Sequence, residues 1–393
     1  MTDRPPHVLY VAWGFPPSRT GGVHRALATA NAFADDGWRV SVITAPREVF
    51  LDVTGADEAL EGLIDPRVDV VRVPFSWPAQ QTDLRRYSAL RVLAPRLWAT
   101  QRVRRDLRAF PEVGYGPWRH RIEAAALELH ARLPVDLVIA TTNPQVAITV
   151  GTRLHEEHGV PYVVDFRDAW TFHTYSGTRR LAADSPAGRW EARAIDAAAE
   201  VWFVNEPLRR WHALAHPGAA ARMHVVMNGY DHDLDLPVVP ADRPDGHRLT
   251  VGYLGTMTPV IPLRELVDGW SYGHAHASEL ADARAELRGY LGYYATPDPG
   301  LAAIVDAAAA SGISYGGPVS KTEVAAVYAG FDVLVLVLGG GEYVTSGKVF
   351  EYMSTGLPVV SVLTPGNAAA GVLAGYPRWH PAADLSPEAI GAA

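Results

Sequence analysis

Cysteine is absent from the 393-residue sequence, which excludes disulfide bonds and metal sites with thiolate ligands. No apolar run reaches the roughly 18 residues that a membrane-spanning helix needs, and the amino end lacks the pattern of a secretory signal. The net charge is −8, and no basic stripe runs along the chain as a whole, which argues against a nucleic-acid partner. We therefore expect a cytoplasmic protein that binds no nucleic acid.

Lysine is scarce, and arginine supplies most of the positive charge. Between positions 84 and 110, several arginines lie among Leu, Tyr and Trp, at Arg85, Arg86, Arg91, Arg96, Arg102, Arg104 and Arg105. A basic amphipathic helix of this kind can rest on anionic lipid, and it can equally be an ordinary solvated helix face. Peripheral contact with a membrane is therefore one of two interpretations of this segment.

The two halves of the chain both alternate buried strands with amphipathic helices. The first half predicts strands at 7–12, 39–44, 68–73, 135–140, 160–164 and 200–205, with helices at 23–35, after 145 as far as Gly159, and from Pro207. The second half predicts strands at 249–254, 287–292, 313–315, 331–338 and 359–362, with helices at 263–283, 299–310, 322–328 and 348–354. This alternation predicts two α/β domains, each with a parallel sheet and right-handed crossovers.

Composition sets the expected domain limits. Residues 234–248 are rich in Pro and Asp, which predicts a linker between an N-terminal domain at 1–233 and a C-terminal domain at 249–393. Residues 74–118 are rich in Trp, Arg and Pro and show no clean period, so we interpret them as an insertion. No G-x-G-x-x-G follows the first strand, so the dinucleotide-binding fingerprint is absent there.

The stretch from 331 to 360 predicts a binding site for an anion. A buried strand at 331–338 is followed by a glycine-bearing loop and by a helix that begins at Lys348. N–H groups at a helix N-terminus attract phosphate, Gly347 lets a ligand approach the backbone, and Lys348 adds a full charge. Glu351, one turn further, can accept two hydrogen bonds from a ribose diol. The alternative is a capped surface helix in which Lys348 and Glu351 pair with each other.

Residues 348–360, KVFEYMSTGLPVV, resemble the donor-binding signature of GT-B glycosyltransferases, specifically the family 4-like retaining branch. In that family the lysine contacts the diphosphate of a sugar donor and the glutamate holds the ribose, which implies these roles for Lys348 and Glu351. Many members carry a second glutamate eight residues earlier. Here Tyr343 stands at that position, with Glu342 beside it, so the paired motif is absent.

Further stretches resemble the same family. Gly21-Gly22 follows the first strand and, in the family, lies close to the donor diphosphate. Asp165–Trp170 matches an Asp-x-Arg-Asp-x-Trp strand end, and Asn228-Gly229 matches the turn that closes the N-terminal half. Gly255 ends a strand where many relatives next carry Arg or Lys; Thr256 and Met257 follow it here. The loop at 316–321 corresponds to one that packs against the nucleobase.

The resemblance implies two Rossmann-like domains that face each other across a cleft, with the donor on the C-terminal domain and an acceptor on the N-terminal one. The expected donor-binding residues are Gly21, Gly22, Gly255, Thr256, Val319, Ser346, Gly347, Lys348, Val349 and Glu351. On the acceptor side, which the insertion at 74–118 would shape, we expect Thr142, Asn143, Arg167 and His173. The candidate catalytic residues are Lys348, Asp165 and Asp168.

Alternatives remain for several of these side chains. Asp165 and Asp168 can cap the next helix and pair with Arg167, or one of them can orient an acceptor hydroxyl. His173 can equally be an ordinary loop residue. His24 and Arg25, at the start of the first helix, can meet phosphate or solvent.

The implied reaction moves a sugar from a nucleotide-diphosphate donor to an acceptor hydroxyl, with retention of anomeric configuration. The acceptor would be a natural product or an envelope glycan. No metal or cofactor is expected, because Lys348 and nearby amides can neutralise the leaving diphosphate. One rival is a UDP-sugar 2-epimerase, which shares the architecture and needs no acceptor. Another is a non-catalytic nucleotide-sugar-binding partner, since Tyr343 replaces a glutamate and the long terminal helix of GT-B proteins is expected to be truncated here.

Overall fold

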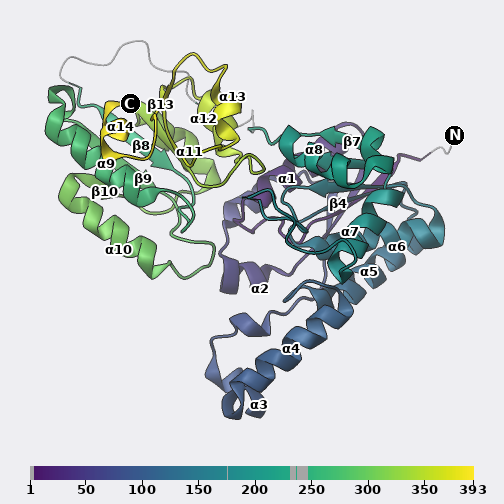
Figure 1. Ribbon diagram of the computed structural model, residues 1–393. Coiled ribbons are helices and arrows are strands. Elements are labelled where there is room, and N and C mark those ends of the chain that lie inside the picture. Colours follow the sequence, from purple (N-terminus) through teal and green to yellow (C-terminus); the bar gives the residue numbers. More distant parts are fainter. Residues whose placement is uncertain (1–3, 175, 231–235, 237–246) are drawn as a thin grey trace. The chain divides into compact units, whose positions relative to one another are not determined.

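The computed structural model describes residues 4–174, 176–230, 236 and 247–393 (Figure 1). The chain forms two compact units. Unit 1 comprises Met1–His173 and Gly177–Val226, and unit 2 comprises Thr174–Ser176 and Met227–Ala393. The predicted linker at 234–248 lies almost wholly outside the described residues, so the domain limits at 233 and 249 stay predictions. Of the helices that the described residues form, none combines the length and hydrophobicity needed to cross a bilayer.

Unit 1 is built on a seven-stranded sheet in the order β3-β2-β1-β4-β5-β6-β7. Its strands are β1 (His7–Val11), β2 (Arg39–Thr44), β3 (Val68–Arg72), β4 (Leu137–Thr141), β5 (Tyr162–Phe166), β6 (Glu200–Phe203) and β7 (Met223–Val225). Every neighbouring pair is parallel. This is the Rossmann order with one strand added, so ligands are expected at the carboxyl ends of the strands near β1 and β4, where the order reverses.

Helices cover both faces of this sheet, which explains why its central strands are continuously apolar. The main helices are α1 (Gly22–Asp35), α5 (Arg119–Arg132), α6 (Ile148–His158), α7 (Pro186–Ala197) and α8 (Glu206–Ala215). A short α2 (Arg47–Val49) follows β2. Because the chain moves in opposite directions from β1 to β2 and from β4 to β5, right-handed crossovers put α1 and α6 on opposite faces.

The insertion predicted at 74–118 contains two helices, α3 (Ala89–Leu93) and α4 (Pro95–Ala109), which extend away from the sheet of unit 1 (Figure 1). We refer to residues 84–110 as the α3–α4 arm. Ser88 caps α3 through its side chain, which accepts a hydrogen bond from the amide of Arg91, and Pro95 occupies the first turn of α4. None of residues 76–105 is buried, so these helices contribute no core of their own.

Unit 2 is built on a six-stranded parallel sheet in the order β10-β9-β8-β11-β12-β13. Its strands are β8 (Thr250–Leu254), β9 (Arg284–Arg288), β10 (Ile313–Tyr315), β11 (Val333–Leu338), β12 (Val359–Leu363) and β13 (Trp379–Pro381). Its helices are α9 (Leu263–His276), α10 (Pro299–Ala308), α11 (Val324–Ala329), α12 (Lys348–Ser354), α13 (Ala369–Leu373) and α14 (Pro387–Ala392). The sheet of unit 2 again runs outward in both directions from its first strand, β8, which lies between β9 and β11.

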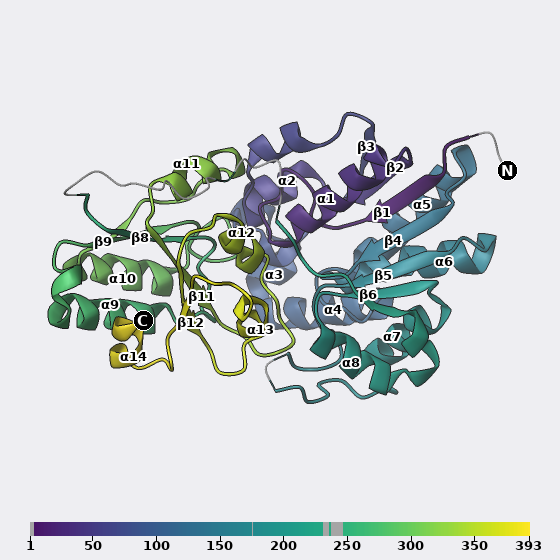
Figure 2. The same cartoon turned by 90° about the horizontal axis from the view of Figure 1, so that it is seen from above.

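Strand β11 shows how the two cores of unit 2 arise from a single apolar run. Val335 and Val337 face the core that α9, α10 and α14 cover, while Leu334 and Leu336 face the core under α11, α12 and α13. Figures 1 and 2 show these two groups of helices on opposite sides of the sheet. The run therefore reads as continuously hydrophobic because both faces of the strand are buried.

The structure corrects two predicted elements and adds others. The helix predicted at 263–283 ends at His276, and the strand predicted at 287–292 is β9 at Arg284–Arg288. The sequence of β9 alternates Ala285 and Leu287 with charged residues, which hides it from a search for apolar runs. Helices α5, α7 and α13 and strand β13 were not predicted as elements.

The glycines that weaken the predicted helix α9 make room for α14. A Cβ on Gly269 would lie 2.3 Å from Cγ2 of Ile390, and a Cβ on Gly273 would lie 3.2 Å from Gly391. The segment at which we expected a truncated terminal helix is thus a short helix packed on α9.

Candidate functional site

The site in unit 2 is built around Lys348, the first residue of α12. Its Nζ donates a hydrogen bond to Oη of Tyr253 at 2.8 Å and to the carbonyl oxygen of Thr256 at 3.3 Å. The same Nζ lies 4.8 Å from the centroid of the Tyr253 ring, a cation–π distance. The lysine side chain passes directly over Gly255, where an added Cβ would lie 1.9 Å from Cε. Lys348 thus places its charge at the carboxyl end of β8.

This position matters because neither Thr256 nor Met257, which follow Gly255, carries a positive charge. Met257 is fully buried in the core and cannot serve a ligand. Lys348 supplies a cation to the same turn from α12. Lys348, Gly255 and Thr256, three of the predicted donor-binding residues, thus contact one another within unit 2, and their role in binding a donor stays a prediction.

Glu351 lies one turn further along α12 and has its own partners. Its Oε2 accepts a hydrogen bond from Nζ of Lys321 at 2.6 Å, and its Oε1 accepts one from Oη of Tyr328 at 2.5 Å. The side chains of Lys321 and Glu351 are only 11 % and 19 % exposed, which strengthens their attraction. Lys348 and Glu351 thus bind different partners, in contrast to the alternative in which they pair on a surface helix.

Two tyrosines beside Glu351 stay protonated. Burial raises the pKa of Tyr328 well above its ordinary value, and the charge of Glu351 adds to this effect. Burial likewise raises the pKa of Tyr352, whose hydroxyl donates to the carbonyl of Leu254 and accepts from the amide of the same residue. Both phenols therefore remain neutral. As hydrogen-bonding groups, Tyr328 holds Glu351 in place and Tyr352 holds the end of β8.

The loop before α12 contains two further predicted donor-site residues, Ser346 and Gly347. Asn228 donates through Nδ2 to the carbonyl of Thr345 at 3.0 Å, so the predicted Asn-Gly turn supports this loop. The amide of Lys348 donates to Oγ of Ser346, and the amide of Val349 donates to the carbonyl of Ser346. A Cβ on Gly347 would meet no atom within 4 Å. The first amides of α12 are thus already bonded, and Lys348 is the main source of positive charge at this end.

Lys321 was missed by the sequence analysis, although it is one of only two lysines in the sequence, the other being Lys348. It begins a short 3-10 turn, Lys321–Glu323, which Ser320 and Glu323 close as a capping box. Val319, two residues earlier, packs against the core under α12. The loop predicted to pack against a nucleobase is therefore joined to α12 through the Lys321–Glu351 ion pair.

In unit 1 the predicted residues gather where β1, β4 and β5 end. A Cβ on Gly22 would lie 1.5 Å from Nη1 of Arg167, so glycine is needed there for the guanidinium to approach α1. Arg167 donates through Nε and Nη2 to the carbonyl of Thr142, both at 3.1 Å, and through Nη2 to the carbonyl of Asn143 at 2.9 Å. Gly21 is exposed. Arg167 thus orders the loop after β4 and brings positive charge to the N-terminus of α1.

The two aspartates differ in their surroundings. Asp165 is buried and accepts two hydrogen bonds from Arg25, at 2.7 and 2.9 Å, and one from Thr141 at 3.0 Å. Asp168 is only partly buried, and its Oδ2 accepts from Nδ2 of Asn143 at 2.7 Å. Asp165 therefore acts within the core of unit 1, while Asp168 is the carboxylate that a ligand can reach.

The other predicted side chains have less specific settings. Thr142 is fully buried, and its hydroxyl forms no hydrogen bond with any of the described residues. His173 is exposed, and its amide donates to the carbonyl of Thr178. Arg25, expected to meet phosphate or solvent, instead holds Asp165.

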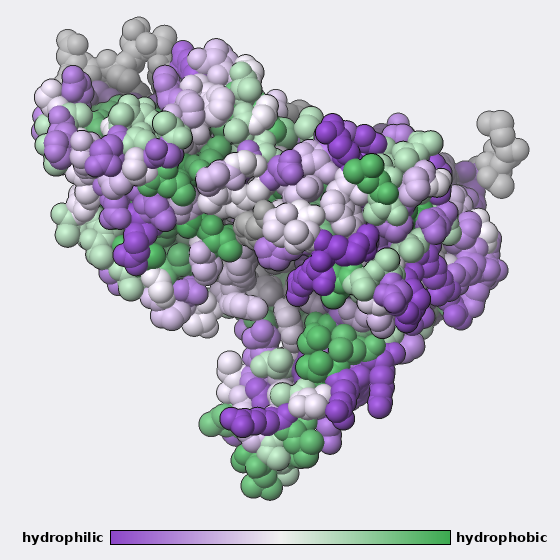
Figure 3. All heavy atoms as spheres, in the orientation of Figure 1, coloured by the Kyte–Doolittle hydropathy of each residue, from purple (hydrophilic) through white to green (hydrophobic). Residues whose placement is uncertain are grey.

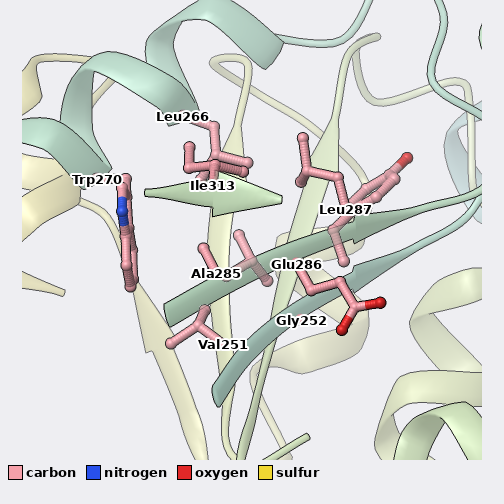
Figure 4. A pocket seen from close by; sticks show the side chains of 10 residues that line it. Val251, Gly252, Leu266, Trp270, Ala285, Glu286, Leu287 and Ile313 are labelled. Atoms are coloured by element: carbon pink, nitrogen blue, oxygen red, sulfur yellow. The ribbon is translucent and has the colours of Figure 1, made fainter. Parts of the chain in front are cut away.

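A small cavity in unit 2 lies beside Tyr253, the partner of Lys348. It measures about 20 Å³ and is lined mainly by apolar side chains, among them Trp270, Leu266 and Leu287, together with Glu286 (Figure 4). A volume of this size holds roughly one water molecule, so it is a packing defect and not a nucleotide site.

Among the described residues, no group of three or more His, Asp or Glu side chains is placed to hold a metal ion. Asp231, Asp233 and Asp235 have Asp-x-Asp spacing, which is common in metal sites, and lie outside the described residues. Independence from metal therefore stays a prediction.

No protein-family model matches the sequence, and no curated protein sequence matches it either. Solved structures do match. The HepE protein of Anabaena, described in complex with UDP and glucose, is 15 % identical with a TM-score of 0.61, covering 98 % of this chain and 88 % of that one. Sucrose-phosphate synthase from Thermosynechococcus elongatus is 15 % identical with a TM-score of 0.62, over 99 % and 88 %.

A putative UDP-N-acetylglucosamine 2-epimerase from Listeria monocytogenes is also similar, at 11 % identity and a TM-score of 0.57, over 99 % of this chain and 87 % of that one. At such identities the likeness shows the fold alone. That fold is GT-B, which confirms the predicted fold class.

Proposed function

We propose that the protein is a glycosyltransferase that uses a nucleotide-diphosphate sugar, with UDP-sugars as the first donor class to test. The observation that carries this proposal is the position of Lys348 at the carboxyl end of β8, with Glu351 one turn further along the same helix. An ammonium there can bind a diphosphate, and a half-buried carboxylate can accept hydrogen bonds from ribose. HepE, which shares the fold, is described with UDP and glucose bound.

In the proposed reaction, the bond between the anomeric carbon and the donor phosphate breaks, and a bond to an acceptor oxygen forms. The hydroxyl proton of the acceptor is released to water, and the electron pair of the broken bond leaves with the nucleoside diphosphate as added negative charge. Lys348 would stabilise that charge, a contribution typically worth about 2.7–4 kcal/mol. Retention of anomeric configuration and a natural-product or envelope-glycan acceptor are parts of this proposal.

Unit 1 would bind the acceptor through the groups gathered at Arg167. Asp168 and Asn143 present a carboxylate and an amide that can orient a hydroxyl. Asp165 contributes indirectly, because its ion pair with Arg25 fixes α1 against β5. Gly21, at the start of α1, leaves the backbone open to a phosphate group, while the space at Gly22 is filled by the guanidinium of Arg167.

The test compares UDP-, TDP- and GDP-sugars in assays of nucleotide release with and without acceptor mixtures. We expect release that depends on the acceptor, and a loss of two to three orders of magnitude in Lys348→Met. Arg210→Glu on α8 is the matched control, because its side chain is exposed and remote in sequence from every candidate. Wild-type turnover in Lys348→Met would exclude this site.

The second candidate, a UDP-sugar 2-epimerase, is supported by the similar fold of the Listeria protein. Conversion of the donor to its epimer without acceptor would establish that function instead. A non-catalytic binding partner, suggested by Tyr343, would show donor binding without turnover. Binding is read from thermal stability, because ligand at about a hundred times its Kd stabilises by about 2.7 kcal/mol.

A further inference from the structure

The α3–α4 arm exposes apolar side chains that nothing in the described chain covers. Six large apolar residues of the arm are exposed: Leu84 (73 %), Val92 (62 %), Leu93 (83 %), Leu97 (50 %), Val103 (37 %) and Leu107 (45 %). Helices in proteins gain most of their stability by packing an apolar face against a partner. A pair of helices with no buried residue between 76 and 105 therefore points to a surface that meets something outside the chain.

The arm is also strongly basic, although the chain as a whole carries a net charge of −8. Residues 84–110 contain eight arginines and one acidic residue, Asp106. Asp106 is 2 % exposed, accepts a hydrogen bond from the amide of Gly114 at 2.8 Å and lies 3.6 Å from Arg102. The one carboxylate of the arm is thus turned inward, and the exposed charged groups of the arm are all arginines, of which Arg85 and Arg86 lie close to Asp83.

The spacing of α4 places the two kinds of exposed side chain on one face. Trp98, Arg102 and Asp106 recur every fourth residue and form the inward side, where Arg102 lies 5.9 Å from the Trp98 ring. The opposite side carries Leu97, Val103 and Leu107 interleaved with arginines at Arg96, Arg104 and Arg108, all exposed. Figure 3 shows hydrophobic and strongly hydrophilic residues mixed over the arm.

We propose that the α3–α4 arm docks onto the surface of a lipid bilayer that contains anionic lipids. Exposed Leu and Val side chains can enter the boundary between headgroups and acyl chains, while guanidinium groups bind lipid phosphates. Two other occupants fit less well. A second copy of this face would oppose arginine to arginine, and nucleic acid would leave the leucines exposed to water. The proposal concerns unit 1 alone and does not depend on the identity of the sugar donor.

The test is sedimentation of the full chain with vesicles of phosphatidylcholine, with and without phosphatidylglycerol. We expect binding only when phosphatidylglycerol is present, and weaker binding as the salt concentration rises, because salt screens exposed charges. Arg104→Glu should weaken binding at least fivefold, which corresponds to about 1 kcal/mol per basic residue. Leu93→Ser should weaken binding roughly tenfold, because the variant loses a leucine side chain that the proposal buries in the bilayer.

Matched controls lie on α8, where Arg210 and Leu214 have similarly exposed side chains, Leu214 at 79 %. Arg210→Glu and Leu214→Ser should leave vesicle binding unchanged, and all four variants should keep the wild-type melting temperature. Equal binding to phosphatidylcholine alone, equal losses in the control variants, or no binding to either vesicle would overturn the proposal. A wild-type dimer in solution that Leu93→Ser converts to monomer would assign the face to a second copy instead.

Discussion

Lys348 and Gly255 share one volume: a Cβ on residue 255 would lie 2.0 Å from the Nζ of Lys348. The two residues are distant in sequence, on α12 and at the end of β8, and they meet because the sheet order places β8 beside β11. The contact fixes the ammonium between Tyr253 and the carbonyl of Thr256. Any larger residue at position 255 would displace the side chain of Lys348, so this position of the lysine requires glycine at 255.

Gly255→Ala should therefore reproduce the loss expected for Lys348→Met. The added methyl group expels the ammonium from its position, so donor-dependent turnover should fall by about two orders of magnitude. Steady-state kinetics and donor titration measure this effect. Gly218→Ala is the control, because a Cβ there meets no atom within 4 Å. Normal turnover in Gly255→Ala would mean that the position of the ammonium is irrelevant to the reaction.

Lys321 should act on donor binding through Glu351. In Lys321→Met the carboxylate loses its 2.6 Å ion pair and keeps the hydrogen bond from Tyr328. We expect KM for the donor to rise about tenfold with a smaller change in kcat, since ground-state binding is affected. Tyr328→Phe provides the comparison. A fall in kcat alone, at constant KM, would contradict this role.

The Arg25–Asp165 pair should be a major source of stability in unit 1. Its side chains are 10 % and 2 % exposed, so Arg25→Met leaves a buried carboxylate without its cation. We expect unfolding to become easier by about 3–5 kcal/mol, measured by urea denaturation. The exposed pair Arg193–Glu156, at 49 % and 43 %, is the control, and Arg193→Met should cost at most about 1 kcal/mol. Equal losses in both variants would refute the distinction.

Unit 1 should lose stability in acid because of a buried histidine. Burial lowers the pKa of His212, which is fully enclosed among Phe166, Phe172 and Phe203. The unfolded chain takes up a proton near pH 6.5 that the folded chain refuses, so stability present above that pH is lost as the pH falls.

The slope should reach about 1.4 kcal/mol per pH unit for this one group. Glu191, beside His212, also loses stability in acid, but in the lower pH range where carboxyl groups titrate: burial raises its pKa, and the nearby imidazole of His216, at 3.7 Å, and the hydrogen bond from Thr171 together lower it below its ordinary value. Urea unfolding of His212→Phe across the pH range of the histidine should show a shallower acid slope than wild type. His120→Gln, on the exposed side of α5, should keep the wild-type slope.

Most of the fold follows from local patterns. Strands β1, β2 and β11 are apolar runs bounded by turn residues, and α6 ends at Gly159 in the left-handed conformation that the sequence suggests. The elements that were predicted wrongly lack such a local pattern. Strand β9 is half charged, and α9 stops at His276 although its apolar spacing continues.

The sequence offers candidate site residues where a short motif contains them and misses side-chain pairs whose members are distant in sequence. Lys348 and Glu351 lie in one motif, so their roles were suggested together. Lys321 is 30 residues from Glu351, and Arg25 is 140 residues from Asp165, so no periodicity connects either pair. Burial separates Asp165 from Asp168, two carboxylates that look equivalent in the sequence.

Because lysine is scarce, the candidate site can be labelled selectively at its amines. Lys321 and Lys348 carry the only side-chain amines in the sequence, and both lie at α12. An amine-acylating reagent can therefore modify no other side-chain amine, and its rate at these two lysines, separated from the α-amine by peptide mapping, reports on this site. Protection from acylation by a candidate ligand would locate that ligand without altering a single residue.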